Sequence, residues 1–146
     1  MALVCLMPFF FDFDPANGVL RCRVEGRLTD GLLKDVYVRA TDYVAKKPPR
    51  AGIMDFSAVT GVQVSNETIR QLAQAPPIMP DMNAPRFIIA TAPRAFGMAR
   101  MFELLGQDSR PNLHVVRSLE AACAILGVKE LHFEPVPDKA RAARQL

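Results

Sequence analysis

Residues 51–72 read AGIMDFSAVTGVQVSNETIRQL, and this stretch decides which fold the sequence predicts. Its first part, residues 51–55, is a short apolar run that ends in Asp55, as expected for a strand covered on both faces. Residues 56–64 are then predicted to form a short apolar loop. Ser65 is a favoured helix N-cap residue, and Glu67 lies where the first turn of its helix would be. The stretch therefore predicts a buried strand, a short loop and a helix that begins at a serine.

Strand and helix patterns alternate on both sides of this stretch. The other expected strands are residues 9–13, 19–25 (ended by Gly26), 86–90 and 113–116, with a short last strand around Leu131 and Phe133. The other expected helices begin at Thr29, Pro93 and Ser118. Strands that alternate with helices indicate a parallel sheet with right-handed crossovers, and the first two strands form a hairpin. We therefore expect a single-domain α/β fold: a mixed, mostly parallel sheet of about five strands with an N-terminal hairpin and about four helices.

Composition and charge narrow the class of function. The chain has 146 residues, of which 50% are hydrophobic and 23% charged, which is typical of one globular domain and excludes low-complexity disorder. No apolar run approaches the roughly 20 residues that a membrane span needs. The net charge of +3 owes much to the basic end of the chain, and no aromatic-rich basic face indicates nucleic acid. We expect a domain at residues 1–134, a charged tail at 135–146, no membrane span and no nucleic-acid partner.

The sequence contains no motif for catalysis, metal binding or nucleotide binding. Cys5, Cys22 and Cys123 are an odd number at wide spacing, which argues against a disulfide framework or a zinc site and favours reduced thiols in a cytoplasm. Neither a Gly-rich phosphate loop nor a nucleophile elbow occurs. His114 and His132 lie in apolar contexts, where a histidine is more often structural or on the surface than catalytic. We therefore expect no enzyme activity, no metal and no cofactor.

The order of these patterns resembles the SpoIIAA-like (STAS) domains, and within that superfamily the small bacterial STAS and CRAL-TRIO-like proteins. In those domains a strand ending in Asp-x-Ser leads through a short loop to a helix that starts with Asp-Ser-Ser-Gly. Asp55, Ser57 and Ser65 occupy comparable positions here, and the stretches 95–102 and 116–127 add further similarity. The resemblance covers roughly residues 18–127. It implies a SpoIIAA-like βα superhelix and a non-enzymatic regulatory role through protein binding.

The resemblance also implies a switch at the start of the helix. In anti-sigma-factor antagonists of this family a partner kinase phosphorylates the second serine of the motif, a position that corresponds to Ser65. Gln63 stands where the family has Asp, and Asn66 replaces its Gly. A helix N-terminus tolerates a phosphate, because its free N–H groups and partial positive charge favour an anion. We expect Ser65, Asp55, Ser57 and Asn66 to form a phosphoacceptor or partner-binding site; the alternative is that Ser65 serves only as a helix cap.

A second function is indicated by residues 76–86, which hold four prolines and two methionines and are predicted to be a surface loop. Under this alternative, Ile78, Met79, Met82 and Arg94 line a pocket for a small apolar or anionic, lipid-like ligand, because methionine adapts to varied partners. Lipid-binding relatives of the fold suggest the same role. The competing interpretation is that the loop folds back over its own core.

Two further expectations concern self-association and catalysis. The apolar start of the chain and Phe9, Phe10 and Phe11 exceed what one short strand should bury, which favours a homodimer. An enzyme would need polar groups that converge in a pocket, for example around Asp55, Ser57 and Arg94. We favour a cytoplasmic protein-interaction module over both the ligand carrier and the enzyme.

Overall fold

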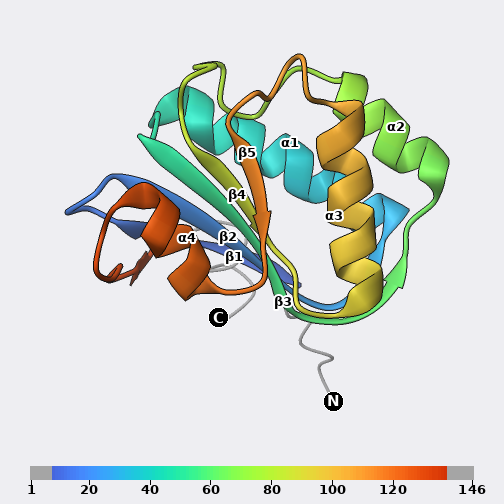
Figure 1. Ribbon diagram of the computed structural model, residues 1–146, viewed down its shortest axis with the longest axis horizontal. Helices are drawn as coiled ribbons and strands as arrows, with labels where there is room; N and C mark the ends of the chain where they lie inside the picture. Colours follow the sequence, from blue (N-terminus) through green and yellow to red (C-terminus); the bar gives the residue numbers. More distant parts are fainter. Residues whose placement is uncertain (1–7, 138–146) are drawn as a thin grey trace.

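A six-stranded mixed sheet forms the centre of the computed structural model, which describes residues 8–137 (Figure 1). The strands are β1 (Phe9–Asp14), β2 (Val19–Thr29), β3 (Ala51–Gln63), β4 (Arg86–Ile89), β5 (Leu113–Val116) and β6 (Glu134–Pro135). The helices are α1 (Asp30–Lys46), α2 (Asn66–Gln74), α3 (Pro93–Leu105) and α4 (Leu119–Leu126). The spatial order is β5-β4-β3-β2-β1-β6, with β2 to β5 parallel and β1 antiparallel to both of its neighbours. The expected mostly parallel α/β sheet with an N-terminal hairpin and four helices is confirmed, with one strand more.

Each face of the sheet is covered by different elements (Figure 1). Helices α1, α2 and α3 cover one face, and the larger apolar cluster lies beneath them, with Val36 of α1 and Ala99 of α3 as members. Helix α4 and the chain that follows it cover part of the other face, where Ala122 belongs to a smaller cluster. The alternation of β2 explains the arrangement, because Cys22 and Val24 point into the larger cluster while Arg21 points to the opposite side.

Local sequence signals place the helix ends correctly. Thr29, Ser65 and Ser118 are N-caps, and their side-chain oxygens accept hydrogen bonds from the third residue of each helix. Pro93 begins α3. Proline is favoured at this position because the N–H that it lacks would have no partner within the helix. Gly127 ends α4 in the left-handed conformation (φ 77°), which suits a residue without a Cβ.

The strands β2 and β3 are longer than predicted. β2 does not end at Gly26 but passes through it with φ 78° and continues to Thr29. β3 does not end at Asp55: residues 56–63, predicted as a loop, continue the strand and pair with the end of β2. The pairing shifts register on each side of Glu25 and Gly26, as a bulge does, and the β-branched residues of segment 56–63 favour extended backbone.

Two further predictions need correction. Residues 76–86 are not simply a surface loop, because Met79 and Ala84 are buried and residue 86 already begins β4. The predicted strand around Leu131 and Phe133 is absent, and those side chains pack on the smaller cluster. Pairing begins only at β6, after which Val136 N–H donates to Phe11 O (3.0 Å). Residues 135–137 thus lie against β1, residues 138–146 lie outside the described part, and the boundary at 134/135 stays a prediction.

The phenylalanines of β1 are accounted for within the chain. Phe9 and Phe11 are buried, and Phe11 stacks on Tyr43 of α1 at 5.7 Å between ring centroids. They therefore do not form the exposed apolar patch on which the expectation of a dimer was based. The apolar residues of the first seven positions lie outside the described residues.

Candidate functional site

Ser65 lies where two neighbouring parallel strands end. Thr29, the last residue of β2, pairs with Gln63, the last residue of β3, and helices α1 and α2 begin directly after these ends. In parallel α/β sheets, ligands commonly bind at the carboxyl ends of the strands. The pairing brings together two helix N-termini, each with free N–H groups and a partial positive charge.

One hydrogen bond joins the two helix starts. The backbone N–H of Ser65 donates to Asp30 Oδ1 at 2.7 Å. The Ser65 hydroxyl accepts from Thr68 N–H and donates to Thr68 Oγ1, both at 3.1 Å. The hydrogen bond from Ser65 lowers the pKa of Asp30, so this carboxylate is charged at neutral pH. An anion attached to the exposed Ser65 hydroxyl would therefore lie beside a carboxylate.

The structure does not bring Asp55 and Ser57 to this site. Asp55 is buried within β3, and residues 56–63 of the strand separate it from the helix start. Its Oδ1 accepts from the N–H of Ser57, which is exposed on the same strand. Of the predicted group only Ser65 and Asn66 lie at the helix start, and the reason is the unexpected length of β3. Asp30 is the neighbour that sequence reasoning missed, because only the pairing of β2 with β3 brings it there.

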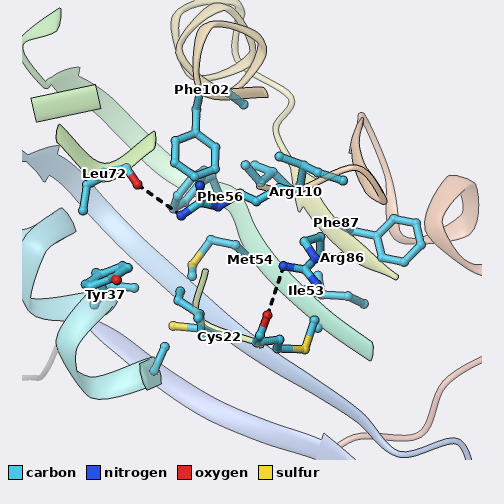
Figure 2. A pocket seen from close by; sticks show the side chains of 18 of the residues that line it. Cys22, Tyr37, Ile53, Met54, Phe56, Leu72, Arg86, Phe87, Phe102 and Arg110 are labelled. Atoms are coloured by element: carbon cyan, nitrogen blue, oxygen red, sulfur yellow. Dashed lines mark hydrogen bonds between the residues drawn. The ribbon is translucent and has the colours of Figure 1, made fainter. Parts of the chain in front are cut away.

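A second candidate site is an apolar cavity of about 160 Å³ between the sheet and helices α1, α2 and α3 (Figure 2). Cys22, Met54 and Phe56 line it from the sheet, and Tyr37 and Phe102 from the helices. Protein interiors are close-packed and hold few voids larger than a water molecule, so a space of this size is unusual. An engineered cavity of about 150 Å³ stays dry and binds benzene. The cavity is thus of a size that suits a small apolar molecule.

The residues predicted to line a pocket divide into two pairs. Ile78 and Met79 line the cavity, whereas Met82 (43% exposed) and Arg94 on the first turn of α3 are exposed and do not. Met79 packs directly against Gly52, where an added Cβ would meet Met79 Sδ and Cε at 3.2 Å. The loop therefore folds back over the sheet at this point.

Two buried arginines, which the sequence reasoning did not select, form the polar part of the cavity wall. Arg86 donates hydrogen bonds to the main-chain oxygens of Met79, Asp81 and Ala84. Burial lowers its pKa, although a guanidinium stays charged in proteins. These hydrogen bonds hold residues 79–84 against Arg86, the first residue of β4.

Arg110 lies after α3 and reaches the C-terminal end of α2. It donates to the carbonyls of Leu72 (3.1 Å), Ala73 (2.9 Å) and Ala75 (3.0 Å) at the end of the helix, where carbonyls run short of partners inside the helix. The Leu72 carbonyl also accepts from the N–H of Ala75 (3.2 Å). Its guanidinium also lies 4.8 Å from the centre of the Phe102 ring. Burial lowers the pKa of Arg110; Tyr37 partly offsets this effect, and the charge of Arg86 adds to it.

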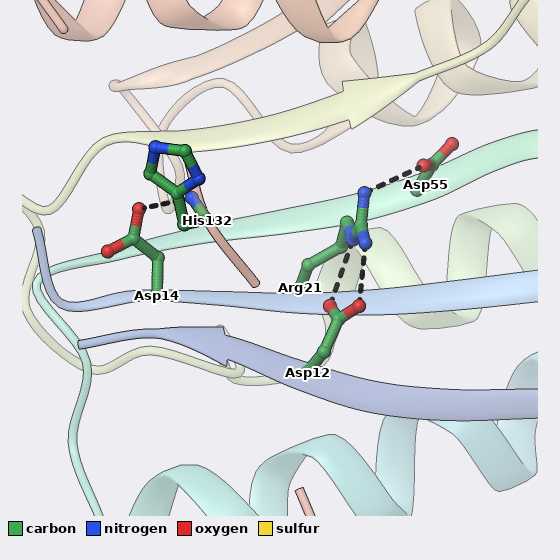
Figure 3. A network of polar contacts seen from close by, with 5 residues as sticks. All are labelled: Asp12, Asp14, Arg21, Asp55 and His132. Atoms are coloured by element: carbon green, nitrogen blue, oxygen red, sulfur yellow. Dashed lines mark hydrogen bonds and ion pairs between the residues drawn. The ribbon is translucent and has the colours of Figure 1, made fainter. Parts of the chain in front are cut away.

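A buried ionic cluster lies on the opposite face of the sheet (Figure 3). Arg21 donates to both carboxylate oxygens of Asp12, at 2.9 and 2.6 Å, and its Nη1 lies 3.9 Å from Asp55 Oδ2. The Phe133 ring covers the guanidinium at 3.9 Å. Asp55 is therefore a partner of Arg21 and has no direct connection with Ser65.

Asp14, also shown in Figure 3, connects the hairpin turn to the C-terminal segment. The residue is fully buried, and its carboxylate accepts from the N–H groups of Asn17 (3.1 Å) and His132 (3.0 Å). Burial alone would raise the pKa of Asp14, but the hydrogen bonds from His132 and Asn17 outweigh it and lower the pKa below the usual 3.8.

This shift predicts how stability depends on pH. Because the folded-state pKa of Asp14 lies below the unfolded value, the carboxylate stabilises the fold above the unfolded pKa, and that stability is lost as the pH falls through the folded pKa. In Asp14→Asn the free energy of unfolding should therefore fall less steeply between about pH 5 and about pH 2 than in the wild type. Urea unfolding across this range measures the slope, with the exposed Asp108→Asn as control. Parallel profiles for wild type and Asp14→Asn would contradict the assignment.

Other reactive side chains offer little chemistry. Burial raises the pKa of the Cys22 thiol far above its usual range, and burial likewise raises that of Cys123, which keeps both protonated. His114 stacks on Phe87 and hydrogen-bonds Asn112. Within residues 8–137, no cluster of three or more His, Cys, Asp or Glu side chains is arranged to hold a metal ion. None of the helices in that range has the length and apolar character of a membrane span.

Element order, sheet topology and the serine-started second helix define the SpoIIAA-like α/β fold, and comparison with solved structures shows the same. The chain is similar to the anti-sigma factor antagonist SpoIIAA in its unphosphorylated form, with a TM-score of 0.56 and 12% identity over 84% of this chain and 99% of that one. It is also similar to the Bacillus cell fate determinant SpoIIAA in the phosphorylated form, with a TM-score of 0.51 and 12% identity over 80% and 98%. No family model and no curated protein sequence matches the chain. At this identity, the similarity shows the fold alone.

Proposed function

We propose that this protein is a non-enzymatic regulatory module of the STAS type, which binds a protein partner through the surface at the start of α2 and is switched by a phosphate on Ser65. The observation that carries the proposal is the exposed hydroxyl of Ser65 at a junction of two helix starts, where the backbone N–H of the same residue donates to Asp30 Oδ1 at 2.7 Å. The fold shared with an anti-sigma factor antagonist that is known in unphosphorylated and phosphorylated forms supports it.

The geometry at Ser65 gives the switch a physical basis. A phosphate adds about −1.5 to −2 charges at neutral pH. The α2 N-terminus favours that charge, but the neighbouring Asp30 carboxylate repels it, and the modified oxygen no longer donates to Thr68. Phosphorylation would thus change the charge of this surface and weaken the contact between the starts of α1 and α2.

Substitutions of Ser65 test the switch. Full-length protein isolated from its native cells should retain the same partner in the wild type and in Ser65→Ala, and lose most of it in Ser65→Glu, which places a negative charge at the site. Ser65→Ala and Ser118→Ala should each lower the free energy of unfolding by about 1 kcal/mol, because each removes an equivalent helix cap.

Ser118→Glu on α4 is the matched control, because it places the same charge at another N-cap. Equal retention of the partner by wild type and Ser65→Glu would contradict the switch. The absence of a partner common to wild type and Ser65→Ala would contradict the module itself. Mass spectrometry of the native Ser65 peptide detects the phosphate directly.

We also propose that the protein is cytoplasmic and forms a homodimer, and both of these proposals rest on the sequence. Reduced cysteines at wide spacing support a cytoplasmic protein, and the apolar first residues support a homodimer.

A carrier or sensor of a small apolar or anionic ligand is the second candidate function. The observation that favours it is the cavity of about 160 Å³, which Ile78 and Met79 help to line. In this case α1, α2 and the loop before β4 would enclose the ligand, and Ser65 would serve as a helix cap.

A further inference from the structure

We propose that the cavity beneath α1, α2 and α3 binds a small monocarboxylate, with an apolar body of about six to eight carbons among the apolar walls and its carboxylate group on Arg86 and Arg110. This inference rests on the second candidate function, ligand binding in the cavity, and adds the charge and class of the ligand.

The first argument is that two buried cations lack an anion. Arg86 and Arg110 are only 8% and 6% exposed, and both line the cavity. In the described range, 8–137, neither forms an ion pair with a carboxylate; their hydrogen-bond partners are neutral oxygens. Buried charges in proteins are normally paired, because removing an ion from water is unfavourable. Among the described residues, no acidic side chain lines the cavity, and Asp81, whose charge partly offsets the lowering of the Arg86 pKa by burial, forms no ion pair with either arginine. The two guanidinium groups are therefore suited to an anionic ligand.

The second argument is the number of hydrogen-bond donors that remain. A guanidinium has five N–H donors. In the described structure Arg86 makes three hydrogen bonds, and Arg110 makes four. Both side chains are thus held in place by the protein, and Figure 2 shows one of these hydrogen bonds for each. Arg86 keeps one N–H on each terminal nitrogen, whereas Arg110 keeps only its Nε–H. A carboxylate accepts several such bonds and pairs well with a guanidinium.

The remaining walls determine the rest of the ligand. Outside the two arginines, the lining is almost entirely aliphatic, aromatic or sulfur-containing. The Tyr37 hydroxyl is already engaged, because it donates to Pro76 O at 2.5 Å. A sugar or nucleotide would leave its polar groups without partners here, whereas a short hydrocarbon chain or a single ring would not. A ligand with one acidic group on an apolar body suits both the two arginines and the apolar walls of the cavity.

A comparison of two probes on the full-length wild-type protein tests the charge of the ligand. Octanoate and octanamide have the same apolar body, and only octanoate is charged at neutral pH. Isothermal titration calorimetry should show octanoate binding about tenfold more tightly or better, as expected when a hydrogen bond to a charged group replaces one to a neutral group. Because this comparison uses no variant, it does not depend on whether a substituted chain folds.

Variants then place the probe in the cavity. Ala99 is a buried residue of α3 that lines the cavity, so Ala99→Leu should block the binding of both probes. Ala124→Leu, on the exposed side of α4, is the matched control and should bind both probes as the wild type does. Arg86→Lys keeps the charge but loses the planar fork, so it should weaken octanoate binding by a larger factor than octanamide binding.

The outcomes separate the inference from the function on which it rests. Tighter binding of octanoate that Ala99→Leu abolishes supports both. Equal binding of the two probes, or tighter binding of octanamide, overturns the inference but leaves a ligand site. If neither probe binds, both the inference and the second candidate function fail.

Discussion

Arg110→Met is expected to lower the free energy of unfolding by about 3 kcal/mol, because it leaves the carbonyls of Ala73 and Ala75 without their donor and removes one of the two donors to Leu72 O. These carbonyls form the C-terminal end of α2, whose partial negative charge the guanidinium also neutralises. Methionine keeps most of the apolar stem, so the loss reports on the guanidinium. Urea unfolding of the wild type and the variant gives the difference.

Arg100→Met is the matched control for this substitution. Arg100 lies on the exposed side of α3 and, among residues 8–137, pairs with Glu103 of the same helix, so its loss should change stability by less than about 0.5 kcal/mol. Arg110→Lys should give an intermediate value, because an ammonium cannot reach all the carbonyls that the fork reaches. If Arg110→Met unfolds as the wild type does, the hydrogen bonds to α2 do not stabilise the fold.

The second large effect is expected at the ionic cluster on the other face of the sheet. Arg21→Met leaves the carboxylates of Asp12 and Asp55 buried and close together without their shared cation, which should reduce stability by about 3–5 kcal/mol. Adding Asp55→Asn to this variant should restore part of the loss, because it removes one of the two charges. Unfolding titrations of the single and double variants measure the restoration.

Arg23→Met is the control for the ionic cluster. Arg23 lies on the same strand as Arg21, and its guanidinium is 5.3 Å from the centre of the Phe10 ring, a contact that contributes about 1 kcal/mol. A loss in Arg21→Met no larger than that in Arg23→Met would show that the buried ion pairs do not hold β1, β2 and β3 together.

The helix starts could be predicted from the sequence because helix capping is local. Thr29, Ser65 and Ser118 each satisfy an N–H three residues later, so neighbouring residues contain all the information required. The length of β3 could not be predicted in the same way. Residues 56–63 become a strand through pairing with the end of β2, and the register shifts of that pairing depend on tertiary structure.

The residues of the candidate sites likewise divide into those that a local sequence signal predicts and those that only the tertiary structure brings together. Ser65 was identified from its own cap signal, whereas Asp30 reaches it only because β2 and β3 end together. Arg110 lies in a polar turn that is typical of the surface, and its carbonyl partners are more than thirty residues away in the sequence. Its burial follows from the packing of α3 against α2. Sequence reasoning therefore found Ser65 and two residues of the cavity wall, Ile78 and Met79, but missed Asp30 and the two buried arginines.

Helix α2 is anchored at its two ends by different parts of the chain: Asp30 holds the N-terminal end and Arg110 the C-terminal end. Between them, Ile69 and Leu72 form part of the cavity wall. One rigid rod of nine residues, about 14 Å long at 1.5 Å per residue, therefore belongs to both candidate sites. Thermodynamic linkage makes any coupling along this rod reciprocal: if a guest in the cavity changes the affinity for a partner at Ser65, the partner changes the affinity for the guest by the same factor.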